Sequence, residues 1–472
     1  MTMGIFAVPV AGRWLIHAPL HGLSAVVNRS AADALAADLR RASEAPARSD
    51  TAADLVEPND LGAMLDTLRE PVEAPKPRTG RLAPQFLGLV PTRGCNLRCG
   101  YCGFGATPHA AVMTPALAVA AVNWMATLVR RGARDTLEVH FFGGEPFAAF
   151  ETVEAAVLRT QLLASQDGVA SRLEVTTNGA YSEERARFAG DHFDTVVLSL
   201  DGFARHHDRH RPRVDGTGSF ATVVRTAGIL SASPTELCLR VCVAEDNLDA
   251  LPEIVDWFCE AFRPSAIDVE TLQQTPEAEV SGLRPPDPYR FARQFLATRR
   301  VGATHAVHVG YAAADLRHAR TSFCPLGHDA LIVHPDGGVT GCYLLDADWR
   351  ARGLDLALGG YSEEHGFHID TDAIQRVRAL TGLKPGCARC FCRWSCAGGC
   401  HVHHSYPGCA TSYDDFCRQT RLITACLLLD ELGLAALGED LIGDAMACEA
   451  LAHWPDDHVD PAAPHGPDRK EA

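Results

Sequence analysis

Residues Cys95 to Cys102 read CNLRCGYC, and this stretch decides how the rest of the chain is interpreted. Its three cysteines have a C-x3-C-x2-C spacing and follow an apolar run, Phe86 to Pro91, that predicts a short buried strand. Three thiolates on one short loop can hold three irons of a cubane iron–sulfur cluster, which leaves the fourth iron open to an outside molecule. A zinc site normally takes four protein ligands from C-x2-C pairs, so the spacing favours the cluster.

The composition is that of an ordinary globular protein. The chain has 472 residues, 47% of them hydrophobic and 22% charged, which is enough for two or three domains. It has no run of about 18 apolar residues and no signal-peptide pattern at Met1 to Pro9, so we expect a cytoplasmic protein. The net charge of −16 disfavours non-specific nucleic-acid binding, and 17 cysteines in such a chain indicate metal or redox chemistry.

Strand and helix patterns alternate over residues 85–300. Six units predict an α/β fold, a partial, TIM-like (β/α)6 barrel, with strands at 86–91, 137–142, 173–176, 195–200, 237–243 and 266–272. The chemistry of such barrels lies at the C-terminal ends of the strands. Polar or glycine-rich stretches stand at these positions, namely residues 143–146, 177–179 and 199–202, and Arg240 lies in the fifth strand.

Two further segments of the barrel region carry explicit predictions. The run from His206 to Arg211 is interpreted as a loop that leads to a helix capped at Ser219. The helix after the fifth strand is expected to begin at Asn247.

The flanking regions are predicted to be smaller units. Residues 1–80 form a small α+β extension, with strands at 6–10 and 13–17, a helix capped by Ser30, and a helix over 58–69. This extension could recognise a peptide or cover the barrel. Helices are expected over residues 421–452, and residues 453–472, rich in Pro, Asp and His, are expected to be a disordered tail.

A second group of cysteines lies within residues 318–420. An apolar strand over 330–334 and the following Pro-Asp-Gly-Gly turn predict a hairpin that brings Cys324 and Cys342 to one place. Five more cysteines follow after a gap: Cys387, Cys390, Cys396, Cys400 and Cys417. In isolation most of these could form zinc ribbons. Cys392 and Cys409 fall outside the pattern and are expected to be packed thiols.

The cluster loop with its aromatic Tyr101, and the Gly-Gly-Glu-Pro stretch, resemble radical S-adenosylmethionine (SAM) enzymes; the later cysteines resemble the SPASM extension. The resemblance covers about residues 85–420. It implies that the open iron chelates SAM, whose reductive cleavage gives a 5′-deoxyadenosyl radical. It also implies three [4Fe–4S] clusters, held by Cys95, Cys99 and Cys102; by Cys324, Cys342 and Cys400 (auxiliary I); and by Cys387, Cys390, Cys396 and Cys417 (auxiliary II).

By the same resemblance, SAM contacts are expected from residues at the strand ends. These are Tyr101, Gly143, Gly144, Glu145, Pro146, Asn178, Ser199, Asp201 and Arg240. Glu145 would accept a hydrogen bond from the SAM ammonium, and Arg240 would meet the SAM carboxylate. A turn cap at Asn178 and a barrel salt bridge at Arg240 are the structural alternatives.

Two departures from the family bear on the chemistry. Several members have an eighth cysteine where this chain has His318, so auxiliary I would have either His318 or an open iron at its fourth position. Sulfatase-maturing members have a carboxylate base directly after the cysteine equivalent to Cys342, where this chain has Tyr343. A tyrosine is a poor base at its usual pKa, although Asp346 and Asp348 are near in sequence.

These features predict a radical SAM/SPASM maturase that installs a thioether, C–C or C–O crosslink in a ribosomally made precursor peptide. We expect an electron donor such as flavodoxin or ferredoxin, and no nucleic-acid or membrane partner. The alternatives are a formylglycine-forming sulfatase-type maturase, a small-molecule radical SAM oxidase and, in another class, a non-catalytic zinc or iron–sulfur binding protein.

Overall fold

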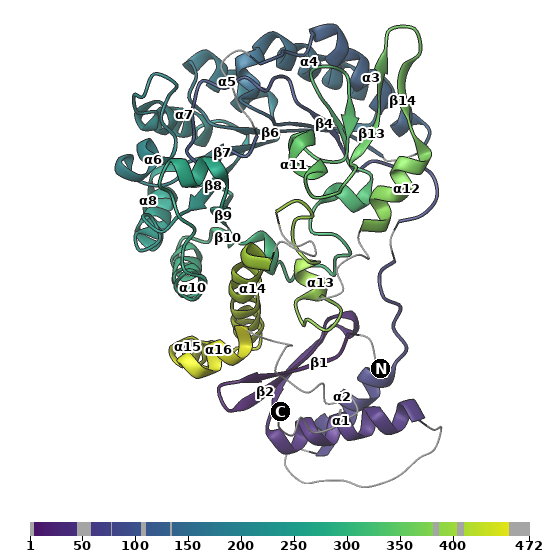
Figure 1. The fold of residues 1–472 in the computed structure, drawn as a ribbon, viewed down its shortest axis with the longest axis vertical. Coiled ribbons are helices and arrows are strands. Elements are labelled where there is room, and N and C mark those ends of the chain that lie inside the picture. The colour runs from purple at the N-terminus through teal and green to yellow at the C-terminus, as the bar shows by residue number, and fades with distance from the viewer. Residues whose placement is uncertain are drawn as a thin grey trace.

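The computed structural model of the protein describes residues 4–44, 58–76, 78–104, 110–132, 135–380, 387–403 and 410–452. The packed thiol predicted at Cys409 and the tail predicted over residues 453–472 lie outside these ranges. A curved sheet with helices on its outer side makes the upper part of the molecule in Figure 1. A small N-terminal unit and the last helices make the lower part.

Within the described residues, the sheet has eleven strands in the order β10-β9-β8-β7-β6-β5-β4-β11-β12-β13-β14. Strands β4 to β10 are all parallel, which confirms the predicted partial barrel. Their bounds are β4 Leu87–Leu89, β5 Thr136–Phe141, β6 Ala170–Thr177, β7 Thr195–Ser199, β8 Glu236–Val243, β9 Ala266–Thr271 and β10 His308–Gly310. The short β10 was not predicted, because His308–Gly310 is not an apolar run, whereas the equally short β4 lies within the apolar run 86–91.

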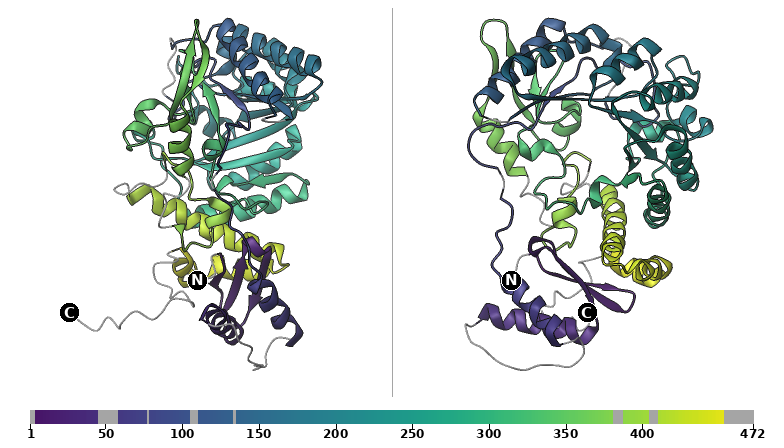
Figure 2. Two further views of the ribbon diagram at one scale, coloured as in Figure 1. Left: turned by 90° about the vertical axis from the view of Figure 1, so that its right-hand side faces the viewer. Right: turned by 180° about the vertical axis from the view of Figure 1, so that it is seen from behind.

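Helices cover the convex side of this sheet (Figures 1 and 2). They are α3 Pro115–Arg130, α4 Phe150–Asp167, α5 Glu183–His192, α6 Ala204–His210, α7 Phe220–Ser231, α8 Leu251–Phe262 and α10 Pro288–Thr304. The short α9, Pro276–Val280, instead packs beside the cluster loop, because Ala278 belongs to an apolar cluster that Tyr101 contacts. Thr114 and Ser182 cap α3 and α5 through their side-chain oxygens, as their positions predict. Helix α8 begins four residues later than expected, because the Asn247 amide instead binds the Ala244 N–H and the Asp201 and Cys242 carbonyls.

The segment from His206 to Arg211 corrects the sequence interpretation. It is helical through His210, and its histidines are buried, with His207 and His210 fully inside, whereas Arg209 is exposed. The Asp208 carboxylate, rather than Ser219, accepts hydrogen bonds from the first N–H groups of α7. The Ser219 hydroxyl is used elsewhere, because it donates to the Arg211 carbonyl.

The sheet continues directly into the cysteine-rich region. The predicted hairpin forms from β11 (Leu331–Val333) and β12 (Val339–Thr340), and β11 also pairs in parallel with β4. Strands β13 (Ala357–Ser362) and β14 (Gly366–Ile369) extend the sheet, beside α11 Asp346–Arg350, α12 Thr371–Ala379 and α13 Arg393–Cys396. The strand that leads into the cluster loop therefore lies between the barrel and the hairpin.

The N-terminal unit has one more strand than predicted. Strands β1 (Phe6–Val10), β2 (Arg13–Ala18) and β3 (Leu23–Val27) form an antiparallel sheet, followed by α1 (Arg29–Glu44) and α2 (Pro58–Arg69). Asn28 caps α1, with its side-chain oxygen 2.9 Å from the Ala31 nitrogen, because the helix begins one residue before the predicted cap Ser30.

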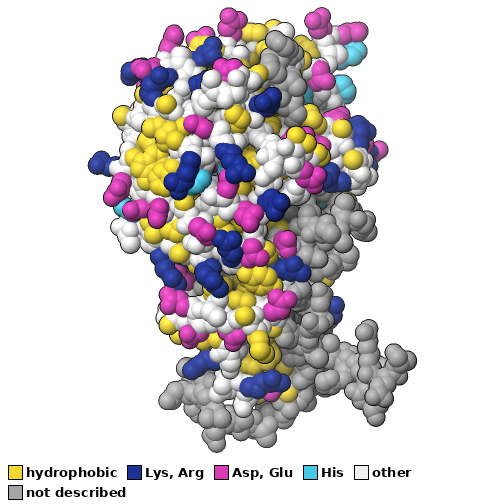
Figure 3. All heavy atoms as spheres, turned by 60° about the vertical axis from the view of Figure 1, so that its left-hand side comes forward, with side chains coloured by type: hydrophobic (Ala, Val, Ile, Leu, Met, Phe, Trp, Pro, Cys, Tyr) yellow, Lys and Arg dark blue, Asp and Glu magenta, His cyan; other side chains and the backbone are white. Residues whose placement is uncertain are grey.

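The last helices connect this unit to the rest of the molecule. They are α14 (Ala410–Glu431), α15 (Ala435–Gly443) and α16 (Ala445–Ala452), and β1 contacts both α15 and α16. In the described part of the chain, no helix is both long and apolar enough to cross a membrane. Acidic and basic side chains are interspersed over the face in Figure 3, so that face has no extended region of one charge.

Candidate functional site

The cluster loop begins where β4 ends. The Thr92 hydroxyl donates to the Ala111 carbonyl and accepts from the Gly94 N–H, which turns the chain into the loop. The thiols of Cys95, Cys99 and Cys102 are partly exposed and lie near enough for their charges to act on one another. Burial, reinforced by the Glu145 charge, raises the pKa of Cys95 to about 11. Iron binding displaces such protons outright, because a coordinated thiol is deprotonated.

Hydrogen-bond donors already point at one of these sulfurs. The Cys95 sulfur accepts from the Leu97 backbone N–H and from the Asn178 side-chain amide, both at 3.4 Å. Donors of this kind stabilise a thiolate that ligates a metal cluster. Asn178 also donates to the Asn96 side chain and so orients the loop. Its side-chain oxygen accepts from the Ala180 N–H, which is the turn cap named as the structural alternative.

The paired glycines let the second strand end lie directly against the loop. A Cβ atom at Gly144 would be 2.2 Å from the Gly94 carbonyl oxygen, and one at Gly143 would be 2.8 Å from the Thr92 carbonyl oxygen. The Gly144 and Glu145 N–H groups donate to these two carbonyls in turn, Thr92 and Gly94. The close backbone approach expected of these glycines is therefore made, at least in part, to the cluster loop itself.

Glu145 requires a correction, because its side chain is not available to an ammonium group. It is only 1% exposed, and its carboxylate accepts from the Thr177 hydroxyl and from the N–H groups of Phe147 and Asn178. Burial raises the pKa of Glu145 to about 7. The side chain joins the ends of β5 and β6, and the buried Pro146 begins a short 3-10 helix there.

Asp201 also requires a correction. It is fully buried, and its carboxylate accepts from the Tyr101 hydroxyl at 2.5 Å, the Arg211 guanidinium at 2.8 Å and the Cys242 N–H at 3.0 Å. The Arg211 guanidinium lies 5.3 Å from the centre of the Tyr101 ring. Asp201 thus fixes Tyr101 and the loop from behind, and no face of it is left for a ligand.

Arg211 and His210 are the functional residues that sequence reasoning missed. The Nδ1 atom of His210 is 3.5 Å from the Asp201 carboxylate, and its Nε2 is 2.8 Å from Asp246. The sequence did indicate them by the unusual density of basic residues at 205–211, but the run from His206 to Arg211 was interpreted as a loop.

Ser199 and Arg240 lie side by side on β7 and β8, in one cross-strand row with Asp268. The Arg240 side chain is 40% exposed and its guanidinium is 3.7 Å from Asp268. It therefore makes the barrel salt bridge named as the structural alternative, and its contact with the SAM carboxylate stays a prediction.

The second group of cysteines separates into two sets in space, with the membership that the resemblance implies. Cys342 lies within electrostatic range of Cys324 and Cys400, and burial, with the charge of Cys400, raises the pKa of Cys342 to about 12. The Cys400 sulfur accepts from the N–H groups of Val402 and His403. His318 is solvent-exposed.

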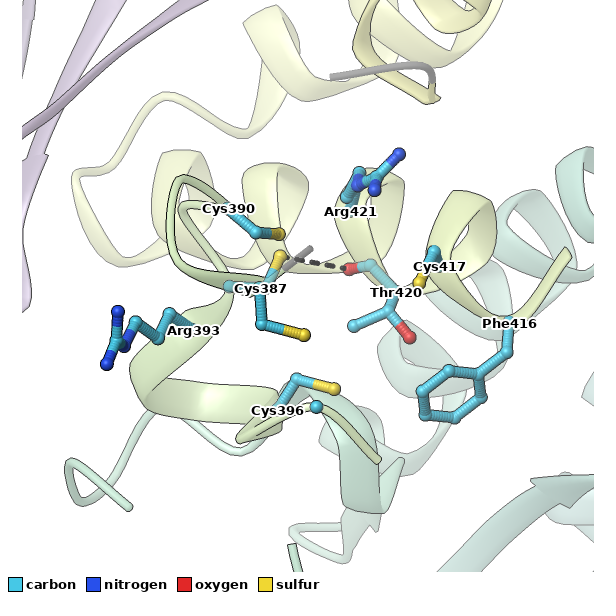
Figure 4. A pocket seen from close by; sticks show the side chains of 10 residues that line it. Cys387, Cys390, Arg393, Cys396, Phe416, Cys417, Thr420 and Arg421 are labelled. Atoms are coloured by element: carbon cyan, nitrogen blue, oxygen red, sulfur yellow. Dashed lines mark hydrogen bonds between the residues drawn. The ribbon is translucent and has the colours of Figure 1, made fainter. Parts of the chain in front are cut away.

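The other set lines a pocket. Cys387, Cys390 and Cys396 face it from the segment around α13, and Cys417 faces it from α14 (Figure 4). Cys392 lines the same pocket and is hydrogen-bonded to the Thr420 carbonyl, as a packed thiol would be. Within the described ranges, no three His, Cys, Asp or Glu side chains are grouped closely enough for a single metal ion. A cubane separates its cysteine ligands by its own irons and sulfides, so its ligands lie farther apart than those of a single ion.

Tyr343 enters the barrel from the cysteine-rich side. A Cβ atom at Gly88 would be 2.5 Å from its hydroxyl, so the glycine in β4 makes room for it. Its ring lies 5.0 Å from that of Phe142. Burial and the Glu174 charge raise the pKa of Tyr343 well above its usual value, which makes it a still poorer base.

Residues 89–258 match the radical SAM superfamily. These residues form a radical SAM domain. The matched segment contains the cluster loop, the glycine pair and the strand ends described above. The chain is therefore an enzyme that uses SAM and a [4Fe–4S] cluster.

Two relatives match the chain outside this domain or within it, and the chain is compared with each in turn. It is 25% identical over 390 residues to the serine-type anaerobic sulfatase-maturating enzyme of Klebsiella aerogenes, covering 77% of this chain and 91% of that one. It is 21% identical over 194 residues to the radical SAM cyclopropyl synthase TigE of Paramaledivibacter caminithermalis, covering 38% and 40% of the two chains.

Among solved structures, native anSMEcpe with bound AdoMet has a TM-score of 0.57 and 17% identity, covering 74% of this chain and 99% of that one. Streptococcus suis SuiB bound to S-adenosylmethionine has a TM-score of 0.50 and 14% identity, covering 85% and 96% of the two chains. These likenesses show a shared fold over about three quarters or more of the chain.

Proposed function

We propose that this radical SAM enzyme is a SPASM-type maturase that crosslinks two side chains of a ribosomally made precursor peptide. One observation carries the proposal: beyond the cluster loop, the described thiols form two further separate sets, one beside β11–β12 and one around α13–α14. Two auxiliary clusters at these sets would give the enzyme three [4Fe–4S] clusters, and an electron sink for a substrate radical.

When bound, SAM and its cluster supply a 5′-deoxyadenosyl radical that takes a hydrogen atom from the substrate. The protein residues would position the reactants. Asp201 and Asn178 hold the cluster loop, Gly144 lets the second strand end close on it, and Arg240 would bind the SAM carboxylate. Tyr343, between the loop and auxiliary I, would pack against the substrate.

The first test is metal content and SAM cleavage on the same anaerobically reconstituted sample. We expect about twelve irons per chain, as three cubanes require, together with 5′-deoxyadenosine when a reductant such as reduced flavodoxin or ferredoxin is supplied. The variant with Cys95→Ala, Cys99→Ala and Cys102→Ala should keep about eight irons and form no 5′-deoxyadenosine. About four irons in the unchanged enzyme would contradict the auxiliary clusters.

A second candidate function is formylglycine formation, which the 25% identity to a sulfatase-maturating enzyme favours. Tyr343 weighs against it, because its hydroxyl is buried and cannot easily replace a carboxylate base. Both reactions remove two hydrogens when the target is serine, so mass alone does not separate them. A crosslink blocks fragmentation between the joined residues, whereas an aldehyde reacts with a hydrazide probe.

The comparison uses short peptides encoded beside the gene, with a serine peptide from a sulfatase as the second substrate. A hydrazide-reactive product from the serine peptide, and no fragmentation-resistant product from the others, would contradict the crosslinking proposal.

The N-terminal unit would recognise the peptide. Within the described ranges, β3 forms one edge of its three-stranded sheet, and an extended peptide can add to such an edge. Removal of residues 1–80 should then weaken peptide binding, and unchanged affinity would reject this role.

A further inference from the structure

Arg93 lies between the cluster loop and the cysteine of auxiliary I. It is two residues before Cys95, yet its guanidinium points to the hairpin region, with Nη2 3.0 Å from His334 Nδ1. This reach is possible because β4 and β11 pair in parallel, with the Val90 N–H donating to the Val333 carbonyl.

Chemistry fixes the direction of the hydrogen bonds that follow. An arginine side chain has donors only, so His334 must accept at Nδ1 and carry its proton on Nε2. That Nε2 lies 2.8 Å from the Thr340 hydroxyl oxygen and therefore donates to it. The Thr340 hydroxyl then donates its own proton to the Cys342 carbonyl, 2.7 Å away. A single directed chain thus connects Arg93 to the backbone of a predicted cluster ligand.

The protonation state of the histidine agrees with this direction. Burial, together with the adjacent Arg93 charge, lowers the pKa of His334 to about 4, so the ring is neutral at pH 7. Arg93 therefore carries the positive charge in this series of hydrogen bonds. The carboxylates of Asp336, Asp346 and Asp348 are the anionic groups that act on it, and Cys342 would join them as a cluster-bound thiolate.

One N–H group of the Arg93 guanidinium also lacks a hydrogen-bond partner among the described residues. Among the described residues, Nη1 of Arg93 is buried without a hydrogen-bond partner. A buried donor left unpaired is costly, so this N–H group suits an acceptor from outside the described residues. An anionic cluster on Cys324, Cys342 and Cys400 is a group of that chemistry.

We propose that Arg93 is a positioning residue for auxiliary I: its charge raises the reduction potential of that cluster, and its hydrogen-bonded chain through His334 and Thr340 fixes Cys342. The inference rests on the proposed auxiliary cluster. The couple is a one-electron reduction, in which the cluster gains one negative charge and no bond forms or breaks. A fixed positive charge favours that reduced state.

The test is a redox titration of the auxiliary clusters with dithionite, followed by electron paramagnetic resonance. The background carries Cys95→Ala, Cys99→Ala and Cys102→Ala, which removes the cluster of the loop. The signal of auxiliary I is the one that Cys324→Ala abolishes. In this background we expect Arg93→Gln to shift the midpoint potential of auxiliary I downward by about 59 mV, a tenfold change in the ratio of reduced to oxidised cluster.

Two variants make the result specific. Arg93→Lys keeps the charge and should recover most of the shift, which also guards against a folding defect in Arg93→Gln. Arg98→Gln removes the same charge from an exposed site in the same loop and should leave the potential of auxiliary I unchanged. Melting temperatures are measured for each variant.

The outcomes separate this inference from the function on which it rests. A retained auxiliary I whose potential is the same in Arg93→Gln overturns the inference alone. A background without auxiliary iron overturns the two-cluster proposal, and the inference with it.

Discussion

At the scale of single residues, Asp201 shows how one buried charge organises the cluster loop. Its carboxylate is surrounded by donors from three places in the chain, Tyr101, Arg211 and Cys242. Burial opposes its ionisation, but the Arg211 charge and the adjacent His210 hold the pKa of Asp201 well below its ordinary value. Asp201 is therefore ionised across the physiological range and keeps the loop in place.

We expect Asp201→Asn to lower the free energy of unfolding by about 3–5 kcal/mol, because the buried Arg211 would lose its counter-charge. Urea unfolding of the protein measures this change. Asp249→Asn is the matched control, since Asp249 pairs with Arg290 but is 71% exposed, and it should change stability by less than about 1 kcal/mol. Equal effects of the two substitutions would contradict the role assigned to Asp201.

At the scale of secondary-structure elements, β2 contains a histidine that the fold keeps neutral. His17 is 5% exposed and its Nδ1 is 2.9 Å from the Ser24 hydroxyl on β3. Burial lowers the pKa of His17 to about 4, whereas an exposed histidine has a pKa of about 6.5. The unfolded segment therefore binds a proton at a higher pH than the folded one.

The N-terminal sheet should lose stability as the pH falls from about 6.5 to about 4, by up to about 3 kcal/mol, because protonation then favours the unfolded segment. Hydrogen exchange of residues 6–27, corrected for the intrinsic pH dependence, measures the local opening. His17→Gln should abolish the dependence, and His365→Gln, at a 73% exposed side chain, should not change it. A pH-independent opening in the unchanged protein would refute the prediction.

The elements that could be predicted from sequence are those whose signals are local. Thr114 and Ser182 stand at helix starts and cap them, and each of the six predicted strands lies in an apolar run of the sequence. Helix α6 was missed because its buried histidines are satisfied by distant partners, such as Asp246. The parallel pairing of β11 with β4 joins segments far apart in sequence, and no local pattern reports it.

The same distinction applies to the candidate site. The resemblance to the SPASM extension, rather than spacing alone, divided the later cysteines into two sets, and the structure brings the members of each set together. The roles of Glu145 and Asp201 were misjudged, because a sequence places a carboxylate at a strand end but does not say whether it faces a ligand or buried donors.

At the scale of the whole molecule, one ion pair fixes the connection between the N-terminal unit and the barrel. Asp329 and Arg378 are both buried and meet through two hydrogen bonds of 2.7 and 2.6 Å. Arg378 also donates to the Gly80 carbonyl, and Asp329 accepts from the Ala83 N–H. The cysteine-rich region thus holds the segment through which the chain enters β4.

Asp329→Asn should release this segment, because Arg378 would remain buried without a counter-charge, at a cost of about 3–5 kcal/mol. Limited trypsin digestion should then cleave faster after Arg78 or Arg81, with fragments identified by mass spectrometry. Asp355→Asn, at a 47% exposed side chain that pairs with Arg376, should leave the cleavage rate unchanged. Unaltered cleavage in Asp329→Asn would show that the segment is held by other contacts.

The position of β4 beside β11 also has a consequence for synthesis on the ribosome. Leu87–Leu89 leaves the ribosome when about half of the chain's length is still to be made before its partner Leu331–Val333. During that interval β4 pairs on one side only, and an unpaired strand edge is prone to misassociation. The sheet around the cluster loop is therefore completed only after the hairpin has been synthesised.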